Sequence, residues 1–317
     1  MQSRFYARLL LAWLAVISCC AGANLTYLRL DPSILTKRFA MVPATLADRL
    51  STLRSQFLSA GCQEPLGEQE VAGAASPNLV CTLTGSEPGT LVIAAQLDYS
   101  SRGDDERVQW ATVELLPLLA ESLRSSTHRH TLVLVALSGR KDEFAGSRQF
   151  LARLDREGRR NLLGIIYLDH LGRVPPAYAH SFTYRAARIQ AGEIVRATVA
   201  TSENVLTVNV GVAAQVLGVA SPPAVDAILP TDTTAFHDAG IPAINFHSLD
   251  YITMAGAGQP ESHQLRTAAD LSVLGDTYNF LCVYVLTVDK LLGEQRSSLS
   301  DVESITIGPF PHEQNHV

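Results

Sequence analysis

The chain has 317 residues, 47% hydrophobic and 18% charged, and this balance is typical of a folded globular protein. One large α/β domain fits this length better than two small ones. The acidic net charge of -6 argues against nucleic acid as a partner.

The N-terminus has the features of an export signal. Arg4 and Arg8 precede an apolar run from Leu9 to Ile17, which ends in small residues. Roughly ten apolar residues are too few to span a bilayer. Two processing sites remain open: ordinary cleavage within 21–23, or a lipobox ending at Cys19, which would then carry the lipid. We expect residues 1–23 to be a signal peptide and the mature protein to be periplasmic or extracellular. A lipid anchor at Cys19 would be its contact with a membrane.

The first elements of the mature chain bring two cysteines close together. A helix is predicted over 45–61, and a strand over 78–83 follows it. Cys62 follows that helix and Cys81 lies in that strand, so an exported protein can bridge them. Cys282 falls in an apolar helix and is expected to be a buried thiol.

Strands and helices then alternate along the chain. In order, the sequence predicts a strand at 90–98, a helix at 108–123, a strand at 130–137, a helix at 145–157, a strand at 162–169, a helix at 187–199, a short helix at 232–240, a strand at 241–248 and a helix at 267–292. This alternation predicts a three-layer α/β/α sandwich with a mostly parallel mixed sheet. We expect one domain over 24–293 and a loose polar tail over 294–317.

Polar residues gather where the predicted strands end. Such sheets place their active site beyond the carboxyl ends of the strands, so these side chains are expected to converge. The plainer interpretation is that they are solvated loop residues. The residues are Gln96, Asp98, Asp104, Asp105, Arg140, Lys141, Asp169 and His170, with Asp232 and His263 from later loops.

Six segments in this order resemble the zinc-dependent aminopeptidases, a family that includes the glutaminyl cyclases. They lie between about residues 78 and 292 and are "LVIAAQLDYS", "SRGDDERVQWA", "LVLVALSGRKDEFAGSRQFL", "IIYLDHLG", "PTDTTAFHDAGIPAINF" and "SHQLRTAAD". The resemblance implies two zinc ions bridged by one Asp, with further His, Asp and Glu ligands. A further Glu acts as general base on a zinc-bound water.

Four positions keep the residue types that the resemblance implies. Asp105 matches the bridging ligand, Asp169 the second carboxylate and His263 the late imidazole. Asp98 matches the Asp behind the first ligand, where it orients a His.

Three other positions depart from the pattern. Gln96 replaces the first His, Arg140 replaces the general-base Glu, and Lys141 replaces the neighbouring ligand. An amide oxygen is a poor zinc ligand and an ammonium has no lone pair to donate. We therefore expect Arg140 and Lys141 to neutralise Asp105 and Asp169 directly, because stranded buried carboxylates destabilise a fold.

Two alternatives would restore ligands. A local slip would bring Asp142 or Glu143 to the ligand position, but the downstream "Ala-Gly-Ser" fixes the register against it. His170 would replace a missing ligand only if it turned toward Asp169, whereas adjacent strand residues face opposite sides.

The sequence thus predicts an exported zinc-aminopeptidase-like protein without cofactor or hydrolytic activity. It would bind a peptide or protein ligand in the former substrate cleft. The alternative is a divergent but active zinc metallopeptidase or glutaminyl cyclase-like enzyme, with zinc as cofactor. A serine hydrolase is excluded because no Gly-x-Ser-x-Gly elbow is present.

Overall fold

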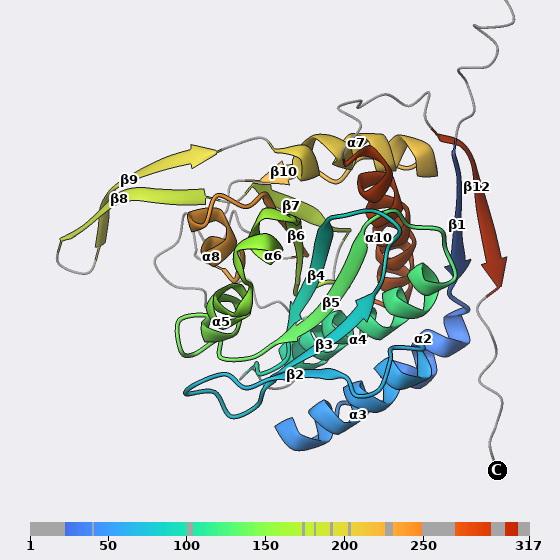
Figure 1. Cartoon of the computed structure of the whole chain (residues 1–317), viewed down its shortest axis with the longest axis horizontal. Coiled ribbons are helices and arrows are strands. Elements are labelled where there is room, and N and C mark those ends of the chain that lie inside the picture. The colour runs from blue at the N-terminus through green and yellow to red at the C-terminus, as the bar shows by residue number, and fades with distance from the viewer. Residues whose placement is uncertain are drawn as a thin grey trace, which may run out of the picture.

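The computed structural model shows an eight-stranded mixed β-sheet with helices on both faces (Figure 1). The strands lie in the order β10-β7-β11-β6-β4-β5-β3-β2. This arrangement confirms the predicted three-layer α/β/α sandwich. The described residues are 23–39, 41–99, 104–172, 175–180, 182–190, 193–201, 204–225, 231–248, 270–292 and 302–309.

Four parallel strands form the centre of the sheet. In sheet order they are β11 (Ala243–His247), β6 (Leu162–Asp169), β4 (Thr90–Gln96) and β5 (Thr131–Leu137). Almost all of their residues are buried, as expected for strands that helices cover on both faces. Their carboxyl ends therefore meet at one edge of the sheet.

The outer strands make the sheet mixed. Beyond β5 lie two antiparallel strands, β3 (Asn78–Leu83) and β2 (Gly67–Gln69). On the other side, β7 (Ala177–His180) runs antiparallel to β11, and β10 (Ala224–Val225) pairs with β7.

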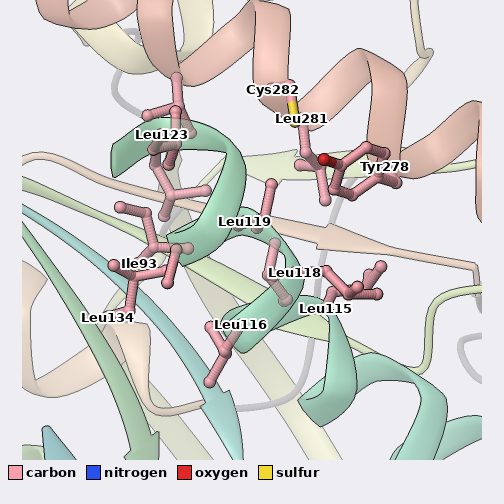
Figure 2. Close-up of a cluster of buried hydrophobic side chains, with 14 of the residues drawn as sticks. Ile93, Leu115, Leu116, Leu118, Leu119, Leu123, Leu134, Tyr278, Leu281 and Cys282 are labelled. Carbon is pink, nitrogen blue, oxygen red and sulfur yellow. The ribbon is translucent and has the colours of Figure 1, made fainter. Parts of the chain in front are cut away.

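Alternate side chains of the central strands pack into two hydrophobic clusters. Leu91, Ile93 and Ala95 of β4 join the first cluster, whereas Val92 and Ala94 join the second. The helices that contribute to the first cluster include α4 (Asp104–Arg124), α7 (Val205–Leu217) and α10 (Leu271–Leu291). Figure 2 shows leucines of α4 between Ile93 and Leu134 of the sheet and the Tyr278–Cys282 turn of α10.

The second cluster lies under α5 (Ala145–Arg153) and α8 (Thr233–Asp238). Phe150 of α5 and Phe236 of α8 pack together there, with ring centroids 6.2 Å apart. Helices α5 and α8 therefore cover the face of the sheet opposite to α4, α7 and α10.

Three further helices complete the described part of the chain: α2 (Pro32–Phe39), α3 (Leu46–Ser59) and α6 (Arg156–Arg160). Thr45 caps α3 by accepting from the backbone N–H of Asp48, which confirms the predicted helix start. The single helix predicted over 145–157 is wrong. Asp155 accepts from the N–H of Gly158 at 2.7 Å and caps α6, so a new helix begins there.

Helix α10 is long and apolar enough to cross a membrane. Two-thirds of its most apolar 18-residue stretch, however, is buried inside the protein, where the helix packs on α4 and α7. Burial of this kind is also found in the core helix of a globular domain.

The cysteines lie as the sequence predicts. Cys62 and Cys81 form a disulfide that ties the end of α3 to β3. Cys282 is a buried free thiol in α10.

The helix predicted over 187–199 is wrong, because this segment is part of a β-hairpin. Its strands, β8 (Phe182–Gln190) and β9 (Glu193–Thr201), pair antiparallel. Five of the nine residues of β9 are Ile, Val or Thr, whose branched side chains favour strands over helices.

Part of the predicted loose tail is also ordered. β12 (Val302–Pro309) pairs in parallel with β1 (Ala23–Arg29) in a separate two-stranded sheet. The tail carries an "SITI" stretch whose β-branched residues favour a strand. The predicted domain limits at residues 23 and 293 stay predictions, as do the signal peptide and Cys19, which lie outside the described residues.

Candidate functional site

Three polar residues occupy the last positions of neighbouring parallel strands. Gln96 ends β4, Asp169 ends β6 and His247 ends β11. The residues just before them, Ala95, Leu168 and Phe246, belong to the first hydrophobic cluster, so these three face the α5 and α8 side. All three are at most 2% exposed. His247 lies in register with Asp169 and was missed from sequence as a site residue, although it lies near the end of the strand predicted over 241–248.

Asp98 connects the end of β4 with the loop that carries Arg140. One carboxylate oxygen accepts from the N–H of Gly139 at 2.6 Å, and the other accepts from the amide of Gln96 and from the N–H of Arg140 at 3.4 Å. The side chain of Gln96 is thus hydrogen-bonded to Asp98, the contact that the resemblance implies for the His that Gln96 replaces. Its own Oε1 is buried and has no hydrogen-bond partner among the described residues.

The loop from β5 to α5 is fixed by a buried polar network. Asn78 accepts from the N–H of Ser138 at 2.9 Å and donates to the carbonyl of Gly146 at 3.0 Å. A Cβ on Gly146 would lie 2.1 Å from the carbonyl oxygen of Ser138, so only glycine fits. This close contact fixes the register of the loop, as the "Ala-Gly-Ser" motif predicts.

The acidic residues of this loop point away from the site. Asp142 and Glu143 are exposed, and Glu143 pairs with Arg148 of α5 at 3.4 Å. Asp142 lies beside Gly73. The slipped arrangement that would recruit either acid is therefore not formed.

Arg140 reaches the buried carboxylate at the end of β6. Its Nη1 lies 3.7 Å from Oδ1 of Asp169, and 37% of its side chain is exposed. Lys141 was also expected to help neutralise the carboxylates. It is exposed and makes no ion pair with Asp169, so that part of the expectation is wrong. The expected contact with Asp105 stays a prediction, because only its backbone, in the first turn of α4, is described.

His170 turns back onto Asp169, contrary to expectation. Its Nδ1 lies 2.7 Å from Oδ1 of Asp169. The strand ends at Asp169 and His170 has a φ of 48°, so the alternation of a strand no longer applies. Gln109 of α4 closes the group, with its Nε2 3.3 Å from Oδ1 of Asp169 and 2.6 Å from Nε2 of the His170 ring.

These contacts determine the charge of Asp169. Burial alone would raise its pKa, but the imidazole of His170, the guanidinium of Arg140 and the amide of Gln109 together hold the pKa well below its ordinary value. Asp169 is therefore ionised at neutral pH and accepts a hydrogen bond from the Nδ1–H of His170.

A second buried carboxylate, Asp232, lies at the start of α8. Burial raises its pKa to about 6, and the hydroxyls of Ser147 and Tyr167 and the charge of Arg140 offset this only in part. Neither oxygen has a hydrogen-bond partner of normal geometry among the described residues. Arg140 is thus the nearby cation that both Asp169 and Asp232 share.

Backbone strain is concentrated around this group. In the described part of the chain, the non-glycine residues with positive φ are Glu143, Phe144 and His170. All three flank the Arg140–Asp169 pair. Strain of this kind persists where the surrounding structure holds it, and such positions cluster at functional sites.

The described residues do not fit a two-zinc centre. Gln96 offers an amide, Arg140 stands where the resemblance expects the general base, and Lys141 is exposed. Nowhere in the described ranges do three His, Cys, Asp or Glu side chains stand close enough to share a metal ion. His263, the expected late imidazole, lies outside the described residues.

Comparison with solved structures gives the same fold. A zinc aminopeptidase from Bacillus subtilis matches with a TM-score of 0.52 and 15% identity over 72% of this chain and 53% of its own. The LapA aminopeptidase of Legionella pneumophila matches with a TM-score of 0.55 and 12% identity over 77% and 64%. Glutaminyl cyclase from Macrostomum lignano matches with a TM-score of 0.54 and 13% identity over 81% and 88%.

The chain spans about half the length of the Bacillus aminopeptidase. No protein-family model and no curated protein matches the sequence. At these identities the likeness shows the fold alone. The chain has the fold shared by zinc aminopeptidases and glutaminyl cyclase.

Proposed function

We propose that this chain is an exported protein of the zinc-exopeptidase fold that holds peptides in the former substrate cleft without zinc and without hydrolysing them. Export rests on the N-terminal Arg4, Arg8 and apolar run, with lipidation at Cys19 left open.

One observation supports the proposed loss of zinc binding and hydrolysis. The guanidinium of Arg140, at the position where the resemblance expects the general base, pairs with Asp169, a carboxylate that the resemblance assigns to zinc. A guanidinium has no lone pair and stays protonated, so it neither accepts a proton from water nor binds a metal. A zinc ion beside it would also meet strong like-charge repulsion.

Charge compensation explains why the site remains ordered. Asp169 and Asp232 are both fully buried, and a buried carboxylate needs a cation or hydrogen bonds. Arg140 supplies positive charge and His170 a hydrogen bond to Asp169, where a metal ion would otherwise hold that carboxylate. The fold then stands without a metal, and the loop geometry of the cleft is kept.

Metal content and activity test this proposal together. The protein purified without added metal should contain only substoichiometric zinc by elemental analysis, and should hydrolyse no aminoacyl substrate with or without added zinc. Stoichiometric zinc, with aminopeptidase or glutaminyl-cyclising activity that a chelator abolishes, would instead establish the active alternative.

A reverted variant is the matched comparison. The triple change Gln96→His, Arg140→Glu and Lys141→Glu restores the residue types that the resemblance expects. We expect zinc affinity to rise in this variant relative to the parent protein. Equal zinc binding by both proteins would show that these three residues do not decide metal binding.

A further inference from the structure

Helix α7 has an exposed side without charge. Its inner side packs on α10 and β11, where Leu206 and Val210 are buried. No residue from 204 to 225 is charged. A surface helix normally carries charged residues on the side that faces water, as α5 does with Arg148 and Arg153. The sequence of α7 is instead that of a helix covered on all sides.

The exposed residues of α7 form one face. Val208, Gly211 and Gln215 are exposed and Val212 is half-buried, and residues three or four positions apart lie side by side on a helix. Val208 is 47% exposed, and Val219, just after the helix, is 48% exposed. They are two of the three exposed large hydrophobic residues in the described part of the chain. Figure 1 shows α7 at the periphery of the molecule, beside α10.

Gly211 lies at the middle of this face, and the fold of a single chain does not require a glycine there. A Cβ on Gly211 would meet no heavy atom of the described residues within 4 Å outside its own helix. Glycine inside a helix costs roughly 0.5–1 kcal/mol relative to alanine. Because glycine lets another backbone come close, this cost is explained if a surface from outside the chain packs on α7 at Gly211.

We propose that two copies of this chain form a symmetric dimer in which their α7 helices cross antiparallel at Gly211. A two-fold axis pairs a surface with itself, so the surface must be complementary to itself. The outer face of α7 meets this condition. It has no charges to repel each other, and Val212 of one copy fills the space over the partner's Gly211. The same axis places Val208 opposite the partner's Gln215.

The absence of charge favours a second copy over a different protein. Charged groups across an interface select one partner among many and keep out the wrong ones. The outer face of α7 offers no such selection, whereas a second copy always presents a matching uncharged face.

The size of the face sets the strength of the dimer. The 13 residues of α7 span about 20 Å. One face of such a helix is smaller than the area of about 800 Å² that each partner buries in a standard interface. We therefore expect a weak dimer that dissociates at low micromolar concentration.

Sedimentation velocity of the full-length protein, from about 2 μM to about 400 μM, tests the proposal. The average mass should rise with concentration from the chain mass of 34.2 kDa toward twice that value. Gly211→Arg should hold the protein at the mass of one chain over the whole range, because the arginine fits beside a single chain and not between two crossing helices. Ser55→Arg is the matched control, since it adds the same side chain at an exposed position of α3, and it should leave dimerisation unchanged.

Thermal unfolding shows whether Gly211→Arg acts on the dimer alone. At about 2 μM, where the parent is a monomer, the midpoint of the variant should equal or exceed that of the parent, because arginine is a better helix former than glycine. A lower midpoint would show that the single chain does need this glycine, and would overturn the argument.

Two double variants test the antiparallel crossing. Val208→Glu with Gln215→Lys places opposite charges across the axis, whereas Val208→Lys with Gln215→Lys places like charges there. Within one helix the two positions are about two turns apart, so the charges do not pair with each other. The first double variant should dimerise at least about tenfold more tightly than the second.

Each result supports or overturns a stated part of the proposal. The mass of one chain at every concentration overturns the dimer. Dimerisation that Gly211→Arg leaves unchanged overturns α7 as the interface, and equal dimerisation of the two double variants overturns the antiparallel crossing. None of these results bears on the proposed function, which concerns the residues at the strand ends.

Discussion

Replacing Arg140 by Gln removes the cation that Asp169 and Asp232 share. Two unit charges 3.7 Å apart interact by about 4 kcal/mol at an effective dielectric constant of about 20. More than a third of the Arg140 side chain is in solvent, and Asp169 keeps its contacts with His170 and Gln109. We therefore expect Arg140→Gln to lower the free energy of unfolding by about 2 kcal/mol, less than the loss of a fully buried pair costs.

The loss should depend on pH in a defined direction. In the folded protein, burial raises the pKa of Asp169, but His170 and Arg140 lower it by more. The net result is a pKa below the ordinary value. The resulting stabilisation is present above the unfolded pKa of about 4 and disappears as the pH falls through the folded pKa. The difference between the parent protein and Arg140→Gln should thus be full at pH 7 and shrink below about pH 4.

Urea unfolding followed by the fluorescence of buried Trp110 measures this difference across pH. Arg54→Gln is the control, because the exposed Arg54–Glu68 pair should contribute no more than about 1 kcal/mol. The reasoning is refuted if Arg140→Gln costs no more than Arg54→Gln at pH 7, or if its cost grows as the pH is lowered below about 4.

Two further predictions concern stability. Burial raises the pKa of Asp232 to about 6, so the folded state favours the protonated carboxyl. The stability that this protonation gives the folded state is lost as the pH rises through about 6. Asp232→Asn should therefore be about 1–3 kcal/mol more stable than the parent at pH 8 and no more stable at pH 4, and a gain equal at both pH values would contradict this. Replacing Cys62 and Cys81 together by Ser opens a disulfide that spans 19 residues and should cost about 3 kcal/mol in urea unfolding. Unchanged stability would show that the bridge does not constrain the unfolded chain.

The central sheet could be predicted from sequence because its strands are continuous apolar runs. The predicted bounds of 78–83 and 162–169 are those of β3 and β6. A run buried on both faces has few alternatives once Gly, Pro or polar residues bound it. The Cys62–Cys81 bridge followed from the same elements and is confirmed.

Errors arose where tertiary contacts or special backbone angles decide the structure. The hairpin of β8 and β9 was taken for a helix because alanines and charged residues masked its β-branched positions. His170 was expected to face away from Asp169, because its positive φ is not visible in sequence. His247 was overlooked because the motif that ends at Phe246 was read no further, although His247 is the last residue of the same strand.

The candidate site was predictable in part. The sequence placed Gln96, Asp98, Arg140 and Asp169 together, and the structure brings them within one hydrogen-bonded and ion-paired group. It did not distinguish Arg140, which turns inward, from Lys141, which turns to solvent, because adjacent loop residues follow no fixed period. Asp105 and His263 stay predictions.

A crystal structure of the protein soaked in zinc, with anomalous diffraction data collected at the zinc absorption edge, tests the central claim most directly. We expect the Arg140 guanidinium beside Asp169 and no anomalous peak within coordination distance of that carboxylate. A peak bonded to Asp169, with Arg140 displaced, would contradict the account.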